Sequence, residues 1–204
     1  MQTSSTLIGR LSGIATIIGG LLWALGGPTA LNADTLGIEM TGPHLLITLA
    51  GLCSLIGLAR LATHHAGHYG LAGMAGTIVA SAGVVLIIAS KNPPLLWMSD
   101  ATGWAVFGAG VLLLAVGSLL YGIVAVRTSK AWLLGAPLLV IGVLGIFELV
   151  FFLLMMGPFA ETAYLGTLGT VVLPILFGIA WSVLGYALWS DRSETVPRPA
   201  RPAS

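Results

Sequence analysis

The chain has 204 residues, of which 57% are hydrophobic and 7% are charged, and its mean hydropathy is +1.02. A soluble globular domain is usually about 25% charged, so this chain has too few charges to cover a surface that faces water. The composition therefore excludes a disordered chain, a basic nucleic-acid-binding protein, a coiled coil and an ordinary soluble enzyme. A polytopic membrane protein remains.

Six apolar runs follow one another along the chain. Each is long enough, at about 20 residues or more, for a helix to cross a hydrocarbon core of about 30 Å. The runs are continuous rather than alternating, which favours helices over a β-barrel. We therefore expect an all-α integral membrane protein with six transmembrane helices. The predicted spans are 8–31, 43–62, 70–90, 103–126, 131–156 and 165–189.

Prolines and glycines are expected to separate these spans. The Gly-Pro pair at 27–28 should weaken the first helix near its end, and Pro43 can open the second. The Asn-Pro-Pro run at 92–94 should stop the third helix, because two backbone donors are missing there. Residues 1–189 are predicted to form one transmembrane domain. Residues 190–204, which contain three prolines, are predicted to form a disordered cytoplasmic tail.

Basic residues are distributed unequally between the two sides that six spans would create. Seven of the eight lysines and arginines fall on the side of both termini, and only Lys91 falls on the other. Because cytoplasmic loops carry an excess of basic residues, both termini are expected to be cytoplasmic, in the plasma (inner) membrane. The seven are Arg10, Arg60, Arg127, Lys130, Arg192, Arg198 and Arg201.

A short motif recurs in the even-numbered spans. Ser54, Ser118 and Ser182 are each followed by apolar residues and a glycine, and they are spaced 64 residues apart. This spacing favours three tandem helix hairpins with the same membrane orientation, rather than the inverted repeats of many transporters. The alternative stays open that any regular six-helix chain of this length repeats near this period.

Glu148 is the one charge deep inside a predicted span. It lies about 7 Å from the midpoint of 131–156, toward the outer face, at about 1.5 Å per residue. An ionised carboxylate there costs about 2.5–3.5 kcal/mol, so we expect it to face the bundle. Thr170, across the next loop, and His44, at the outer end of the second span, are candidate donors to it. Glu148 is then either a proton, cation or ligand site, or a protonated carboxyl that hydrogen-bonds to a neighbouring helix.

Three histidines, His64, His65 and His68, cluster between the second and third spans. His64 and His68 are four residues apart and could share a helical face, as metal ligands do. No carboxylate or cysteine joins them, so they are also interpreted as solvated imidazoles. The single cysteine, Cys53, lies in an apolar run and is interpreted as a small packing residue. No metal and no cofactor is expected.

Three further features carry a family resemblance. These are the Gly-Val-Leu-Gly run at 142–145, the gap after the fifth span, and the Gly-x-Leu-Leu stretches of the first and fourth spans. In these features the layout resembles small bacterial six-span membrane proteins of the HdeD (acid-resistance) type. The resemblance implies six helices in three hairpins, and it implies no functional residue.

Three functions are compatible with the sequence. Because paired catalytic groups are missing, the first is a non-enzymatic inner-membrane protein with a stress-related, structural or accessory role. The second is a small permease or proton-coupled carrier that uses Glu148, and the third is an intramembrane enzyme. The expected partners are the lipid bilayer and either a second copy of the chain or a membrane complex. Nucleic acid is not an expected partner.

Overall fold

The computed structural model describes residues 2–91, 100–127, 132–155 and 167–190, and all the regular structure in these ranges is helical. No strand occurs within them. The elements are α1 (Gln2–Leu31), α2 (Ala33–Leu36), α3 (Thr41–Ser90), α5 (Asp100–Arg127), α6 (Trp132–Met155), the π-helical segment η1 (Leu168–Val172) and α8 (Leu173–Ser190).

Six helical stretches are long and apolar enough to cross a membrane, which confirms the six-helix expectation. Every boundary lies within three residues of the predicted one. Apolar length thus places the spans well, because each must cover the same hydrocarbon thickness. The stretches are Leu7–Leu31, Thr41–Thr63, Tyr69–Ser90, Thr102–Arg127, Trp132–Leu154 and Leu168–Ser190.

One local feature differs from the sequence expectation. The second and third spans belong to one helical element, α3, which is kinked at Gly70 (φ 61°, ψ −163°). This backbone conformation is essentially limited to glycine, so Gly70 turns the chain where a loop was expected. α1 continues through the Gly-Pro pair at 27–28 and ends at Leu31, as the predicted span does. Both the backbone N–H and the side-chain Nδ2 of Asn32 donate to the carbonyl oxygen of Pro28, at 3.1 and 2.8 Å.

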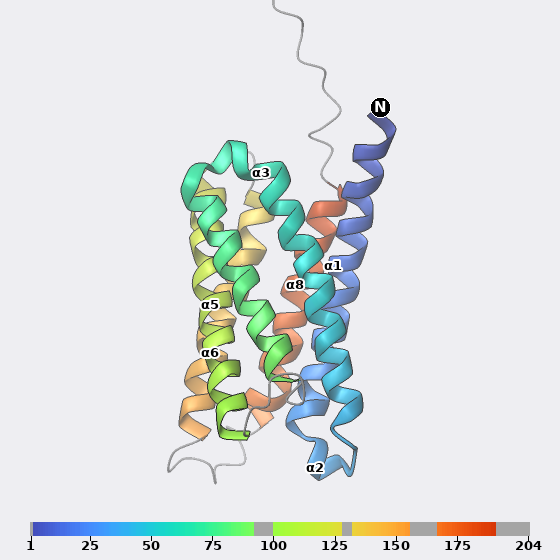
Figure 1. Ribbon diagram of the computed structural model, residues 1–204, viewed down its shortest axis with the longest axis vertical. Helices are drawn as coiled ribbons and strands as arrows, with labels where there is room; N and C mark the ends of the chain where they lie inside the picture. Colours follow the sequence, from blue (N-terminus) through green and yellow to red (C-terminus); the bar gives the residue numbers. More distant parts are fainter. Residues whose placement is uncertain (1, 92–99, 128–131, 156–166, 191–204) are drawn as a thin grey trace, which may run out of the picture.

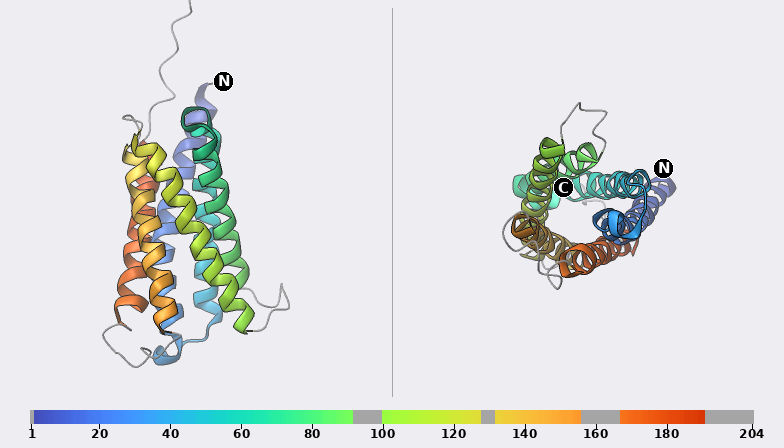
Figure 2. Two further views of the ribbon diagram at one scale, coloured as in Figure 1. Left: turned by 90° about the vertical axis from the view of Figure 1, so that its left-hand side faces the viewer. Right: turned by 90° about the horizontal axis from the view of Figure 1, so that it is seen from below.

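The helices form a closed ring (Figures 1 and 2). In order around the ring they are α1, the first half of α3, its second half, α5, α6 and α8, which packs back against α1. The α3–α5 and α1–α8 contacts are the most extensive, and the α6–α8 contact is the least extensive of the ring. The start of α1 and the end of α8 lie at the same end of the bundle (Figure 1).

Glycines allow the neighbouring backbones to approach closely. On α1, Gly13, Gly20 and Gly27 repeat every seven residues and all face α8. A Cβ atom on Gly13 would lie 2.6 Å from the Cβ of Trp189. Gly83 and Gly110 oppose each other between α3 and α5, where a Cβ on Gly83 would lie 2.6 Å from the carbonyl oxygen of Gly110. Such small-residue seams are typical of helices packed within a membrane.

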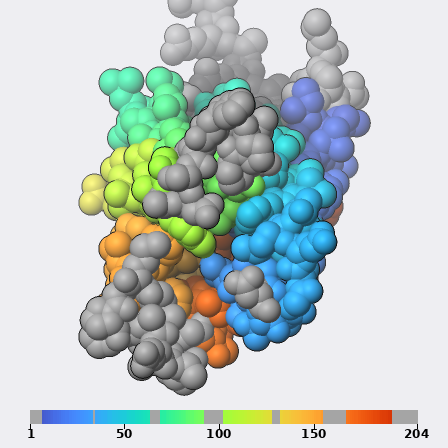
Figure 3. All heavy atoms as spheres, turned by 60° about the horizontal axis from the view of Figure 1, so that its bottom comes forward, coloured from blue at the N-terminus to red at the C-terminus, as the bar shows by residue number. Residues whose placement is uncertain are grey.

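The bundle has two ends that differ in the elements they contain. The Gly70 end contains the kink of α3 together with the start of α1 and the end of α8. The α2 end contains α2, the start of α3 and the end of the second half of α3 (Figure 1). Figure 3 brings the α2 end forward and shows α2 and the start of α3, in blue, beside the beginning of α8, in orange.

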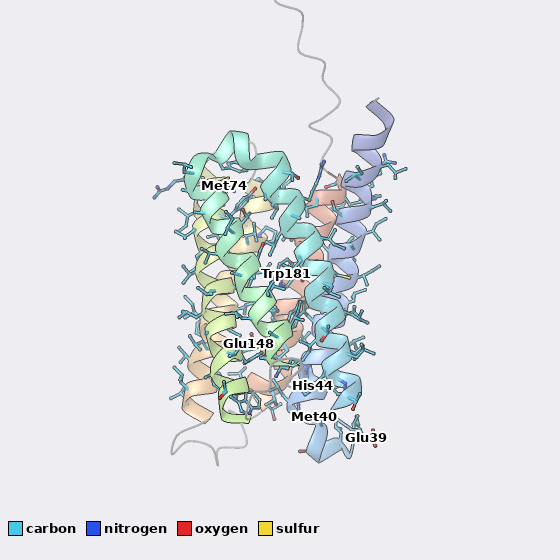
Figure 4. All side chains as sticks on the ribbon, in the orientation of Figure 1. Glu39, Met40, His44, Met74, Glu148 and Trp181 are labelled. Carbon is cyan, nitrogen blue, oxygen red and sulfur yellow. The ribbon has the colours of Figure 1, made fainter. Side chains whose placement is uncertain are left out.

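Large side chains sort between the outside and the interior of the ring. Exposed apolar residues occur on all six spans, for example Leu21, Val85 and Phe147. Trp181 is fully buried near the middle of the bundle (Figure 4), with its ring 6.3 Å from that of Phe177. The indole of Trp181 therefore fills the core of the bundle.

Candidate functional site

Glu148 lies on the face of α6 that points into the ring. Ile141, seven residues earlier on the same face, is fully buried, whereas Phe147 and Val150 are exposed on other faces. Glu148 itself is partly buried and lies in the half of the bundle nearer to α2 (Figure 4). The helical repeat therefore directs the one acidic side chain of α6 inward, as the sequence predicted.

Lys91 is the group that faces Glu148. It follows the last residue of α3, and its backbone N–H donates to the carbonyl oxygen of Ile88 at 3.2 Å. It continues the inner face of α3, because Val84, seven residues earlier, is fully buried. The Lys91 ammonium and the Glu148 carboxylate interact electrostatically. Two opposite charges, one directly after α3 and one on α6, thus influence each other near the α2 end.

Two aromatic rings of α5 cover the Lys91 ammonium, and a third ring, from α6, packs against them. The Lys91 Nζ lies 4.7 Å from the ring centroid of Trp104 and 4.3 Å from that of Phe107. Phe152 completes this aromatic cluster, with its centroid 5.4 Å from that of Trp104 and 6.1 Å from that of Phe107. Both distances from Nζ are within the range of about 6 Å for cation–π attraction.

The environment changes the proton affinity of Lys91. Burial lowers the pKa of its ammonium from 10.5 to about 8, and the opposing Glu148 carboxylate raises it in part. Desolvation is the larger influence, because the ammonium loses water on being enclosed by rings and helix. Lys91 can therefore release and take up a proton close to neutral pH, which a lysine in water does not do.

His44 and Thr170 were predicted as partners of Glu148. His44, in the first turn of α3, is partly buried and interacts electrostatically with Lys91, so it belongs to the same charged group. Thr170 lies in η1, and its carbonyl oxygen is 3.5 Å from the Nδ2 of Asn32, which ties η1 to α1. The hydrogen bond from Thr170 to Glu148 stays a prediction.

Lys91 was missed as a site residue because sequence analysis placed it in an outer loop. One signal was available. Lys91 is the only basic residue on its side of the predicted membrane, and it directly follows a span, where positive charge is otherwise scarce. An isolated basic residue at the end of an inner helix face indicates an acidic partner nearby. Glu148 is that partner, because its carboxylate interacts electrostatically with Lys91.

Further polar groups lie deeper in the ring. The Nε1 of Trp23 donates to Ser54 Oγ at 3.1 Å, and Ser54 donates to the carbonyl oxygen of Ala50 at 2.9 Å. Ser118 Oγ and Trp181 Nε1 are fully buried and have no hydrogen-bond partner among the described residues. Buried polar atoms are normally satisfied, so these two need a partner from outside the described chain, such as water or a ligand.

The remaining predicted candidates lie elsewhere. The side chains of His64 and His68 lie outside what the structure describes, so their role as metal ligands stays a prediction. Within the described ranges, no group of three His, Cys, Asp or Glu residues could hold a metal ion. Cys53 lies at the α1–α3 seam, where a Cβ on Gly19 would lie 2.8 Å from the Cys53 Cβ. This tight contact agrees with a packing role.

The architecture is that of an all-helical protein with six helices able to span a membrane. No protein-family model, curated protein or solved structure matches the chain. The resemblance to proteins of the HdeD type therefore stays a prediction, and the charged group at the α2 end is the basis for a function.

Proposed function

We propose that this chain is a small permease or proton-coupled carrier, and that Glu148 and Lys91 form its exchange site. The observation that carries the proposal is the electrostatic interaction of these two opposite charges, together with the two aromatic rings that cover the Lys91 ammonium. Ionisable groups are costly within a membrane protein and mark ion or proton pathways when they face the bundle interior.

The chemistry of Lys91 favours exchange over a permanent ion pair. A lysine with a pKa of about 8 changes its charge under mild conditions, and each change alters the counter-charge that Glu148 needs. A carrier must bind a proton or ligand and then release it, which requires a site whose charge is easily switched. The aromatic cluster keeps water away from one side of the Lys91 ammonium and so helps to keep its pKa low.

Polar atoms deeper in the ring also favour a carrier. Ser118 and Trp181 provide a hydroxyl and an indole N–H in the buried interior, and Trp181 lies between Glu148 and the Gly70 end (Figure 4). Water or a ligand that reached the interior would find hydrogen-bonding partners in these groups. A purely structural bundle gains nothing from leaving them unsatisfied, since each such group costs about 1–3 kcal/mol.

A flux measurement on the purified chain tests the proposal. Liposomes containing the protein and a pH-sensitive dye are given a pH gradient, with valinomycin and potassium to prevent charge build-up. We expect protein-dependent proton flux that is lost in Glu148→Gln and retained in Glu39→Gln, an exposed acid on another part of the α2 end. Equal flux in wild type and Glu148→Gln would refute a carrier that uses Glu148.

A non-enzymatic structural or accessory role is the second candidate. Its support is the dense glycine packing of the seams and the filling of the core by Trp181. In this case the Lys91–Glu148 pair would only hold α3 to α6, and the chain would act through a second copy or a membrane complex, for instance under stress. Absence of proton flux, with an intact fold, would favour this role.

The proposal includes a placement in the bacterial plasma membrane with both termini cytoplasmic and three tandem hairpins. It is supported by the seven basic residues on one side and by the common location of the start of α1 and the end of α8. An impermeant maleimide applied to intact cells should label a cysteine at position 39 and not one at position 127, in a Cys53→Ala background. The reverse labelling would refute this orientation.

A further inference from the structure

We propose that the site at the α2 end recognises an organic ammonium cation, which takes the place of the Lys91 ammonium over the Trp104 and Phe107 rings and interacts electrostatically with Glu148. This inference rests on the proposed function, because it names the substrate class of the carrier. The Lys91 Nζ marks the place where the positive charge of a bound cation would lie.

The rings offer a corner rather than a flat wall. Trp104 and Phe107 are both on α5, with centroids 6.0 Å apart and planes at 87°. The Lys91 Nζ lies over both rings, at 4.7 and 4.3 Å from their centroids. A cation in this corner is attracted by two ring faces at once, which is the arrangement that proteins use to bind quaternary ammonium groups.

A third ring, that of Phe152 on α6, packs against Trp104. Phe152 is four residues beyond Glu148, so both side chains lie on one face of that helix. Its ring is tilted by 30° to that of Trp104, with centroids 5.4 Å apart. Glu148 and Phe152 therefore bring a negative charge and an aromatic ring together from one element, opposite the corner on α5.

The charge of the site selects against other ligands. Glu148 would repel an anion as soon as Lys91 gave up its proton or moved aside. A hard metal cation such as Ca²⁺ needs about six to eight oxygen ligands, whereas the described residues here offer one carboxylate and three aromatic rings. One charge and apolar walls fit a small, weakly hydrated organic cation best.

Because the cation competes with the Lys91 ammonium for the same position, the affinity for the cation should depend on pH. The described charged or titratable groups around Lys91 are Glu148 on α6 and His44 at the start of α3, and the side chain of Asp100 on α5 is outside what the structure describes. Lys91, with a pKa of about 8, is mostly protonated at pH 7 and mostly neutral at pH 9. A permanently charged ligand should therefore bind about tenfold more tightly at pH 9 than at pH 7.

The test uses radiolabelled tetramethylammonium, whose charge does not change with pH, and equilibrium dialysis against the protein in nanodiscs. We expect Lys91→Gln to bind about tenfold more tightly than wild type at pH 7. Because this is a gain of binding, a damaged fold cannot produce it. Glu148→Gln should weaken binding at least tenfold, and Trp104→Leu about fivefold, since one cation–π contact contributes about 1 kcal/mol.

Two control variants match these changes. Glu39→Gln removes an exposed acid, and Trp132→Leu removes a tryptophan that is 60% exposed on α6. Neither should alter binding of tetramethylammonium. If they weaken it as much as the site variants do, or if Lys91→Gln binds no more tightly than wild type, the inference is refuted.

The outcome also separates this inference from the proposed function. Proton flux that depends on Glu148, together with no binding of tetramethylammonium by Lys91→Gln, refutes the ammonium site and leaves the carrier. Loss of both flux and binding refutes both. Flux together with tighter binding by Lys91→Gln supports both.

Discussion

The seam between α3 and α5 ends in two different ways. At the Gly70 end, Tyr69 and Tyr121 are both buried and pack edge to face, with ring centroids 5.4 Å apart. At the α2 end, the same two helices place the Lys91 ammonium over Trp104 and Phe107. Aromatic packing is present at both ends, and at the α2 end it covers an ammonium whose pKa burial lowers to about 8. One end therefore stabilises the bundle, and the other is able to respond to its surroundings.

The largest effect is expected from a bulky side chain in the close contact between α3 and α5, which runs between the two ends. In Gly83→Leu, the new side chain would meet the backbone of Gly110 and Leu114, which cannot move aside. We expect a loss of about 3 kcal/mol in the free energy of unfolding, seen as early thermal unfolding of the detergent-solubilised protein. Gly42 has no atom within 4 Å of its Cβ position, so Gly42→Leu should unfold as wild type does. Equal effects in both variants would contradict a close-packed seam.

A pH series would separate the charged end from the aromatic end. The pKa of Lys91 is about 8 in the folded protein and 10.5 when unperturbed. Between these values the unfolded chain binds one more proton, so stability must rise as pH rises from 8 to 10.5. At about 1.4 kcal/mol per pKa unit, the total gain approaches about 3 kcal/mol. Unfolding temperatures at several pH values measure it.

Two variants make this pH prediction specific. Lys91→Met has no charge to lose, and Lys91→Arg keeps its charge over the whole range. Both should therefore lack the rise in stability that wild type shows between pH 8 and 10.5. A rise of the same size in Lys91→Met would assign the effect to another group.

The Gly70 end should depend on backbone conformation instead. Gly70 has φ 61° and ψ −163° and open space around its Cβ position. Gly70→Ala should cost about 2 kcal/mol through backbone strain alone, and this cost should be the same at pH 7 and pH 9. Chemical denaturation of Gly70→Ala and of the control Gly42→Ala measures it. A cost that changes with pH would show that backbone strain is not its only source.

The smallest effect is expected for the tyrosine pair. A double-mutant cycle with Tyr69→Leu and Tyr121→Leu should give a coupling energy of about 1 kcal/mol. The coupling should be insensitive to salt, because the edge-to-face contact carries no net charge. A coupling energy near zero would show that the two rings only fill space.

Much of the fold could be predicted from the sequence, because the bilayer imposes a simple rule on apolar length. That rule located all six spans, including the first, which runs through Pro28 to Leu31 as predicted. The cost of a charge in lipid is the reason to expect Glu148 to face the bundle. The connection at Gly70 could not be predicted in this way, since a polar, glycine-containing segment between spans is compatible with either a loop or a kinked helix.

The composition of the site was harder to predict. Glu148 and His44 were selected as candidates because charged or titratable groups at membrane depth are rare. Lys91 was not, because its pairing depends on where the ring places the end of α3 relative to α6. Trp181 illustrates the same limit, since the hydrophobicity of a span does not tell which of its residues point into the ring.

The seam between α1 and α8 has a consequence for biogenesis. The residues that meet there are about as far apart in the chain as two residues can be, from Gly13 against Trp189 to Gly27 against Pro174. Because α1 is synthesised before α8, the glycine face of α1 stays uncovered until α8 has been made. Since the start of α1 and the end of α8 lie together (Figure 1), a circular permutant joined there and opened between α5 and α6 would keep the α1–α8 seam and complete it early in synthesis.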